Sequence, residues 1–400
     1  MFINESIQTP ITKKCDVLVC GGGFGGISAA LAAARCGKKV VLLEKLYMLG
    51  GLGTAGLVTI YLPLCDGMGR QVSFGIAEEL FRLSVSLGAE DRYPDNWLDS
   101  DDPEGRTNKT KRFQVQYNAQ LFAILAEKLL LKEGVEILYG TSAVATHKDG
   151  DKIDAVIVEN KTGRYGISVG SVVDASGDCD IAKFAEAPTA LFQQGNILAG
   201  WYYYAGQNGF KLKTVGFCDI PDDQKTENYK DRNLIAKRFL GLDGEELSEI
   251  MQLSHNATLH DFLKLREEDP SIFPTTIATT PQIRMTRRID GEYTMHSTEM
   301  HTYFEDSVGM VSDWRKRGPV YEVPFRTLYS AKVKNLITAG RCTSVTDSMW
   351  DIMRVIPCCA VTGEAAGTAA AMTNDFTTLD IAQLQAKLAA NGVVIHEKDL

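Results

Sequence analysis

The stretch that decides the fold is "KCDVLVCGGGFGGISAALAAARCGKKVVLLEK", residues 14–45. An apolar run that ends at Cys20 predicts a strand, and a glycine-rich turn follows it. An Ala-rich segment closed by Gly37 predicts a helix of about ten residues, and a second apolar run ends at Glu44. A strand, a helix and a second strand in this order form the βαβ unit from which parallel sheets are built. The stretch therefore predicts an α/β protein with a Rossmann-like domain.

The turn fits the dinucleotide-binding pattern G-x-G-x-x-G through Gly21, Gly23 and Gly26. In that pattern the first glycine permits a tight turn, the second lets the backbone approach a pyrophosphate, and the third allows close helix packing. The anion then lies at the helix N-terminus, where free N–H groups and the helix dipole favour negative charge. Glu44 follows Gly26 by 18 residues, at the strand end where a carboxylate accepts hydrogen bonds from an adenosine ribose.

A second match to the same pattern lies in "GGLGTAGLV", residues 50–58, through Gly51, Gly53 and Gly56. It runs into "LVTIYLPL" rather than into a helix, so it lacks the context of a second Rossmann turn. A lone match is a weak signal in a chain with 36 glycines. The high glycine content of this loop therefore needs another explanation.

Composition narrows the class of protein. A chain of 400 residues with 44% apolar content can bury a sizeable core and favours two or three domains. A net charge of −9 argues against a nucleic-acid partner, because such binders depend on clustered Lys and Arg. The N-terminus lacks a signal-peptide pattern, and no apolar run approaches the roughly 18 residues of a membrane span. We expect a cytoplasmic protein without a membrane partner, and homo-oligomerisation is left open.

The cysteines predict neither a redox pair nor a metal site. They number nine, and none forms a C-x-x-C pair, so we expect no disulfide framework, zinc site or iron–sulfur cluster, and no metal. Cys15 and Cys20 have the C-x4-C spacing of a redox pair, but five strand steps of about 3.3 Å separate them by roughly 16 Å. Cys358 and Cys359 are expected to be buried thiols.

The remaining α/β elements lie in two further parts of the chain. Residues 117–134 predict an amphipathic helix, and "VEILY" after it predicts a strand. Three alternating segments within 141–170, separated by "DGD" and "KTG", predict a three-stranded meander. The α/β character returns with "VKNLITAGR", a Gly/Ala-dense helix over 357–372 and a final helix near 378–390.

Two insertions are expected to form the substrate region. The longer one predicts helices at about 226–240 and 243–268 and strands around "PQIRMTRRIDGEYTMH", residues 281–296. The shorter one predicts a helix over 70–88, followed by the polar segment 91–105, which is expected to be a surface loop or lid.

Four motifs in order cover nearly the whole chain: the opening stretch, "GGLGTAG", "VVDASGDCDIA" and "NLITAGRCTSVTDSMWDIMRVIPCCAVTGEAAGTAAA". Together they resemble the FAD-dependent oxidoreductase family of the glutathione-reductase-like two-domain flavoproteins. The resemblance implies an α/β fold whose Rossmann-like FAD-binding domain has a central parallel sheet and a three-stranded β-meander. A discontinuous mixed α+β substrate domain completes it. The FAD-binding domain would comprise residues 1–63, 113–187 and 330–400, and the substrate region 64–112 and 188–329.

The resemblance also implies how the motifs meet the cofactor. Backbone N–H groups of Gly51 to Thr54 would reach the pyrophosphate, ribityl chain or ring edge at distances that a Cβ would obstruct. The helix that begins at Pro357 would point its N-terminus at the N1/O2 edge of the flavin. The residues placed at FAD are Gly21, Gly23, Phe24, Gly25, Gly26, Glu44, Lys45, Gly51, Leu52, Gly53, Thr54, Val144, Ala175, Ser176, Gly177, Gly340, Arg341 and Ile356.

Two departures from the relatives matter. No histidine stands between Glu44 and Thr59, where succinate dehydrogenase relatives attach FAD covalently, so noncovalent FAD is expected. No second strand–glycine–helix unit with a distal acid is visible, so a dedicated NAD(P)H domain is not expected.

Candidate catalytic residues lie mainly in the longer insertion, residues 188–329, which we call the second insertion because it comes later in the chain. Arg284 and Arg288 would share one face of a strand, and an arginine there could clamp a carboxylate; the alternative is a salt-bridged or solvated strand face. His296 and Tyr321 are acid/base candidates, with ordinary strand positions as the alternative. The candidates are Arg288, His296, Tyr321, Arg326 and Arg354, the last two because the resembling motifs place them near the cofactor.

The sequence therefore predicts an FAD-dependent oxidoreductase that transfers a hydride between a small organic substrate and flavin N5. The substrate, the direction and the electron acceptor or donor stay open. An NAD-dependent dehydrogenase using the single Rossmann unit is one alternative. A flavin-binding protein in electron transfer or RNA modification is another, against which the acidic charge and the missing cysteine clusters count.

Overall fold

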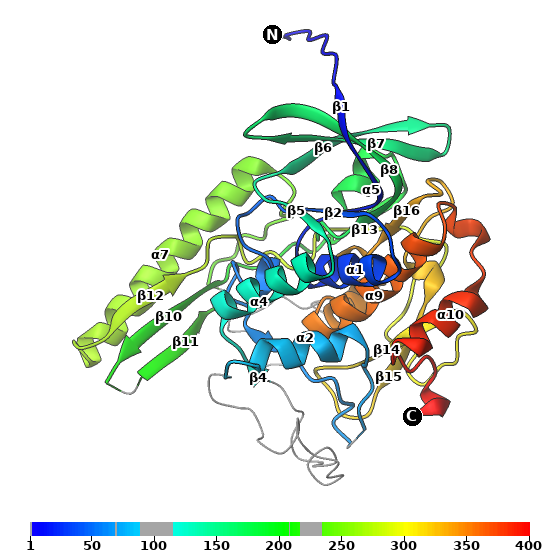
Figure 1. Cartoon of the computed structure of the whole chain (residues 1–400). Helices are drawn as coiled ribbons and strands as arrows, with labels where there is room; N and C mark the ends of the chain where they lie inside the picture. The colour runs from blue at the N-terminus through cyan, green and yellow to red at the C-terminus, as the bar shows by residue number, and fades with distance from the viewer. Residues whose placement is uncertain (1, 69, 89–114, 208, 217–233) are drawn as a thin grey trace.

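The computed structural model describes residues 2–68, 70–88, 115–207, 209–216 and 234–400. A mixed sheet of seven strands, in the order β5-β2-β1-β8-β7-β6 with β16 paired to β8, forms its centre (Figure 1). The predicted polar loop at 91–105 lies outside the described residues. The strands of the sheet are β1 (Ile11–Cys20), β2 (Val40–Leu43), β5 (Glu136–Leu138), β6 (Ser142–Asp149), β7 (Lys152–Asn160), β8 (Gly163–Asp174) and β16 (Leu336–Thr338).

The predicted βαβ unit is confirmed as β1, α1 (Phe24–Arg35) and β2. β1 and β2 pair in parallel from Val17 with Val40 to Cys20 with Leu43. All four residues of β2 are buried, as expected for a parallel strand covered on both faces. Cys15 and Cys20 are free buried thiols on one strand, as predicted.

The predicted meander is also confirmed, but its last strand is longer than the pattern indicated. β8 is one continuous strand that pairs antiparallel with β7 and parallel with β1. β16 then joins β8 in parallel at its carboxyl end. Because β1, β8 and β16 run in the same direction, the turns that follow them all open at one edge of the sheet.

Helix α9 (Ile356–Met372) packs against α1 at backbone distance. A Cβ added at Gly363 would overlap the carbonyl oxygen of Gly25, and one at Gly367 would overlap that of Ala29. The glycines of α9 therefore serve close helix packing. The helix begins at Ile356, one residue before the predicted Pro357.

The three-stranded sheet β11-β10-β12 lies to one side of the central sheet and packs against α7 (Gly244–Glu268), at the left in Figure 1. Its strands are β10 (Gly200–Gly206), β11 (Gly209–Val215) and β12 (Phe273–Ile277). α7 begins where predicted, because the side chain of Asp243 accepts hydrogen bonds from the amides of Glu245 and Glu246.

Two elements predicted in the second insertion are wrong in part. Residues 234–240, the described part of the predicted helix 226–240, are not helical, and Phe239 instead exchanges two backbone hydrogen bonds with Asn196. The predicted strands at 281–296 reduce to β13 (Arg287–Ile289), which pairs with β9 (Thr189–Leu191). The Asn196 side chain accepts the amides of Arg284 and Met285, so a side chain replaces the strand partner there.

The main core extends beyond the Rossmann elements. Helix α2 (Ile76–Val85), from the shorter insertion, shares a hydrophobic cluster with α1 and α9, and so do β14 (Ser307–Ser312) and β15 (Val320–Pro324). The remaining elements are α4 (Ala119–Lys132), α5 (Asp180–Phe184), α8 (Asp347–Met353), α10 (Ile381–Ala390), β3 (Ile60–Tyr61) and β4 (Val115–Gln116). Within the described ranges no single helix is long and apolar enough to cross a bilayer; only α8 and α9, taken together across a 90° bend, meet that criterion.

A buried carboxyl joins α2 to α9. Glu364 is 2% exposed, and its carboxylate accepts the amide of Ile76 at 2.7 Å. Burial raises the pKa of Glu364 to about 7. Because this pKa is higher in the folded than in the unfolded chain, the protonated form is the one that stabilises the fold.

We expect the stability contributed by Glu364 to be lost as the pH rises from about 4.5 to about 7. Glu364→Gln keeps an acceptor for the Ile76 amide and carries no charge. The free energy of unfolding of the variant should therefore rise relative to that of wild type as the pH increases, by up to about 3 kcal/mol. Unfolding curves at pH 5 and pH 8 with saturating FAD measure this difference, and a pH-independent difference would contradict the assignment.

Candidate cofactor and substrate site

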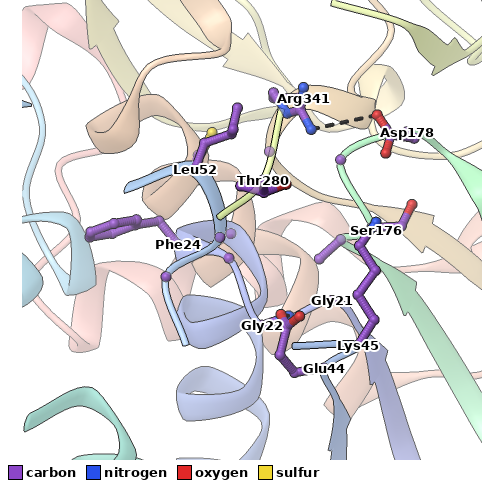
Figure 2. A pocket seen from close by; sticks show the side chains of 18 of the residues that line it. Gly21, Gly22, Phe24, Glu44, Lys45, Leu52, Ser176, Asp178, Thr280 and Arg341 are labelled. Atoms are coloured by element: carbon purple, nitrogen blue, oxygen red, sulfur yellow. Dashed lines mark hydrogen bonds and ion pairs between the residues drawn. The ribbon is translucent and has the colours of Figure 1, made fainter. Parts of the chain in front are cut away.

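A cavity of about 400 Å³ opens at the edge of the sheet where β1, β2, β8 and β16 end (Figure 2). Its walls come from the turns after these strands, from the loop after Glu44 and from the start of α9. The second insertion adds Thr280, Pro281, Ile283 and Arg284. Parts of the chain that are distant in sequence thus meet at one site.

At one position of the first glycine turn, packing within the protein does not explain why the residue is glycine. Gly21 has a φ of +108°, and an added Cβ there would overlap the carbonyl oxygen of Ala175. A Cβ at Gly26 would overlap the carbonyl oxygen of Gly21. Gly23 has an ordinary φ of −71°, and no atom lies within 4 Å of an added Cβ. The space beside Gly23, at the N-terminus of α1, therefore fits a phosphate group.

The second glycine loop is rich in glycine mainly because it packs closely against the first glycine turn. The amide of Gly50 donates to the carbonyl of Gly22 at 2.7 Å, and Gly50 and Gly23 form a parallel bridge. A Cβ at Gly53 would overlap the ring of Phe24. The second match to the glycine pattern thus supports the wall of the site rather than a nucleotide of its own.

The expectation for the amides of this loop is corrected in part. Gly53 and Thr54 donate to the carbonyls of Gly50 and Gly51 inside a short 3-10 turn, and neither residue lines the cavity. Their amides are therefore not available to a cofactor. Gly51 and Leu52 do line the cavity.

Glu44 holds the glycine turn from below, as Figure 2 shows. Its carboxylate accepts the amides of Gly22 and Leu46, each at 2.8 Å. Burial raises the pKa of Glu44, and these hydrogen bonds oppose the shift. Each oxygen retains a second lone pair, so the carboxylate can also accept from a ribose hydroxyl.

The turn after β8 is fixed by a buried acid. Asp174 is fully buried and accepts the amide and hydroxyl of Ser176 and the amide of Ala182. Burial raises the pKa of Asp174. These bonds hold the backbone of Ala175 and Ser176 at the cavity wall.

Arg341 connects this turn to the second insertion. Its guanidinium donates to the carbonyl of Ile283 at 2.8 Å and lies 3.5 Å from the carboxylate of Asp178 (Figure 2). Asp178 and Asp180 both line the cavity, although the sequence reasoning did not select them. Their place directly after the "ASG" motif is the signal that could have found them.

At the start of α9 the cavity is lined by Val355, Ile356 and Arg354. Arg354 donates to the carboxylate of Asp351, which is fully buried and also receives Arg315 at 3.3 Å. This network fixes the guanidinium of Arg354 at the cavity wall.

Among the five candidate catalytic residues, Arg354 lines the cavity and the other four do not. His296 is exposed, and the hydroxyl of Tyr321 donates to the carbonyl of Ser297. The other two are Arg288, which lies over Trp350, and Arg326, which donates to Asp306. Arg284 lies in the irregular segment 281–286 whereas Arg288 lies in β13, so the strand face that these two arginines were predicted to share does not exist.

Most of the predicted FAD-binding residues line the cavity: Gly21, Gly23, Phe24, Gly25, Glu44, Lys45, Gly51, Leu52, Ala175, Ser176, Gly177, Gly340, Arg341 and Ile356. Gly26, Gly53, Thr54 and Val144 do not. Val144 lies too far along β6, and residues 141–143 before it reach the cavity instead.

Comparison with known proteins agrees with this geometry. The model of the family "FAD dependent oxidoreductase" matches residues 16–238 and 242–388. A probable electron transfer flavoprotein-quinone oxidoreductase from Escherichia coli is 25% identical over 150 residues, 36% of this chain and 32% of that protein. Glutathione reductase from Schizosaccharomyces pombe is 29% identical over 136 residues, 33% of this chain and 25% of that protein. The matches thus span a third or less of these curated relatives.

Among solved structures, a geranylgeranyl bacteriochlorophyll reductase-like protein from Thermoplasma acidophilum aligns over 94% of this chain and 83% of its own. The TM-score is 0.46 and the identity 13%. The family match extends over most of the chain, and the glycine turn, Glu44 and the open space beside Gly23 fit the cofactor that the family implies. The chain therefore belongs to the FAD dependent oxidoreductase family.

Proposed function

We propose that the protein holds FAD noncovalently along this cavity and transfers a hydride between a small organic substrate and flavin N5. The observation that carries the proposal is the continuity of the cavity from the glycine turn and Glu44 to Arg354 and the start of α9. FAD supplies the hydride chemistry when it is bound. The chain must bind it, orient the substrate and exclude water.

The residues that would hold FAD follow from their places in the cavity. The N-terminus of α1 beside Gly23 suits the pyrophosphate, and Glu44 suits the ribose hydroxyls. The N-terminus of α9 at Ile356 would favour the negative charge that reduction adds to the flavin edge. Arg354, fixed by the buried Asp351, adds a positive charge to the same end.

The electron-transfer alternative draws on the name of the Escherichia coli relative, whose match covers 36% of this chain. The two functions differ in what reduces the flavin. A small substrate that reaches the cavity would do so directly, whereas an electron-transfer protein would need a protein or quinone partner.

Purified protein should be yellow, and acid should release its flavin as free FAD, since no histidine lies between Glu44 and Thr59. Chromatography of the supernatant measures this. FMN, or flavin retained on the denatured chain, would contradict the proposed site.

Anaerobic mixing with a panel of small organic acids, alcohols and amines should bleach the flavin absorbance with at least one compound. Bleaching only by reduced quinones or electron-transfer proteins would favour the alternative.

Gly23→Val should greatly reduce FAD retention while the protein stays folded, because only the ligand space lies beyond an added Cβ. Gly244→Val, at the exposed start of α7, is the matched control, since its Cβ also meets no atom within 4 Å. Gly56 is unsuitable as a control, because a Cβ there would lie 2.9 Å from backbone atoms of Leu52. Flavin-to-protein absorbance ratios and circular dichroism measure the outcome. Equal retention in both variants would remove Gly23 from the cofactor site.

A further inference from the structure

A buried polar cluster of Arg284, Trp201 and Gln282 adjoins the cavity. Arg284 lines the cavity although it is only 3% exposed. Its guanidinium lies 5.2 Å from the ring centroid of Trp201 and donates to the carbonyl oxygen of Gln282 at 3.4 Å. The three residues therefore form one contact group, which we call the Arg284 cluster.

The cluster is held rigidly beside the second glycine loop. The amide of Thr279 donates to the carbonyl of Ala55 at 2.8 Å, and the side-chain amide of Gln282 donates to the carbonyl of Gly56. The backbone amide of Arg284 donates to the side chain of Asn196 at 3.1 Å. Since both ends of the segment are fixed, the guanidinium has a defined place at the wall.

Two polar atoms of the cluster have no partner among the described residues. They are Nε1 of Trp201, in a side chain 7% exposed, and Oε1 of Gln282, in a side chain 2% exposed. Buried donors and acceptors are normally paired, so an unpaired donor and an unpaired acceptor on two residues that both contact Arg284 need a further group. Arg284 is the member of the cluster that lines the cavity, so a ligand there would reach the cluster at its guanidinium.

We propose that the Arg284 cluster binds the carboxylate of an acidic organic substrate, an inference that rests on the proposed oxidoreductase function. A guanidinium presents a planar fork of N–H groups that matches a carboxylate, and the interaction is stronger in a buried site than in water. Trp201 Nε1 provides a further donor. Gln282 Oε1 can accept from a hydroxyl or amino group carried by the same substrate.

The cluster comes from a different part of the chain than the groups that suit the pyrophosphate and ribose of FAD. The pyrophosphate has its place at the N-terminus of α1, beside Gly23. Arg284 belongs to the second insertion, on a segment bound to Ala55 and Gly56. Because the whole chain carries a net charge of −9, a buried cation at this wall is a local feature and not part of a general positive surface.

The test uses FAD-loaded protein and three small probes: acetate, glycolate, which adds a hydroxyl, and acetamide, which lacks the charge. Binding is measured at constant ionic strength from the flavin difference spectrum and from the shift in melting temperature. We expect acetate and glycolate to bind, glycolate more tightly, and acetamide to show no binding. Arg284→Gln should weaken acetate binding at least about tenfold, since a charge-assisted hydrogen bond is lost. Arg266→Gln, on the exposed surface of α7, should leave it unchanged.

Trp201→Phe keeps the ring beside the guanidinium and removes only the N–H, so it tests the cluster even if Arg284→Gln does not fold. It should weaken acetate binding about threefold to tenfold and leave the FAD content unchanged. Acetate binding that is absent in wild type, or equal in wild type and both variants, would overturn the proposal. Loss of FAD from Arg284→Gln would also overturn it, because Arg284 would then belong to the cofactor site. Colourless wild-type protein would instead contradict the proposed function.

Discussion

The site depends on backbone that meets backbone around the glycine turn of residues 21–26. The turn after β8 touches it at Gly21, the loop after β2 bonds to it at Gly22, and α9 touches it at Gly25. An added side chain would overlap a neighbour at Gly21 and Gly22 and would crowd backbone atoms at Gly25, so these close contacts depend on glycine. Gly23 is the exception, since its missing side chain leaves space for a ligand.

Two acidic side chains hold the turns of the same region in place. Glu44 follows β2 and Asp174 ends β8, the two strands that flank β1, and each carboxylate accepts hydrogen bonds from backbone amides of a turn. Burying a carboxylate is costly unless hydrogen bonds satisfy it, and here those bonds hold the turns that line the cavity. The same hydrogen bonds thus offset the cost of burying the two carboxylates and fix the shape of the cavity wall.

Much of the fold could be predicted because its signals are local. The opening strand–turn–helix–strand unit, the meander and α9 follow from apolar periodicity, turn residues and glycine spacing within short windows. The second insertion was harder, because the side chain of Asn196 replaces strand pairing for residues about 90 positions away. No window of sequence contains that bond, so residues 281–286 resembled a strand.

The same distinction holds for the site. Residues of the glycine turn and Glu44 could be placed from their spacing, because one motif supplies them all. Arg284 was recognised as a carboxylate-binding candidate, but its place at the cavity depends on contacts with Trp201 and with the loop at Gly56. Of the predicted catalytic residues, Arg326 and Arg354 were assigned from the family resemblance and the other three from residue type and strand pattern, and only Arg354 reaches the wall.

The glycine contacts between α1 and α9 have a consequence for how relatives of this protein can diverge. Since Gly363 and Gly367 bring the helices to backbone distance, the distance between the two helix N-termini stays constant as long as both positions remain glycine. The loop at 50–58 bonds to the glycine turn, whereas the irregular segment at 278–286 contacts that loop and can change without altering the helix distance. The part of the cavity wall between Thr280 and Arg284 can therefore vary among relatives while the helix pair stays constant.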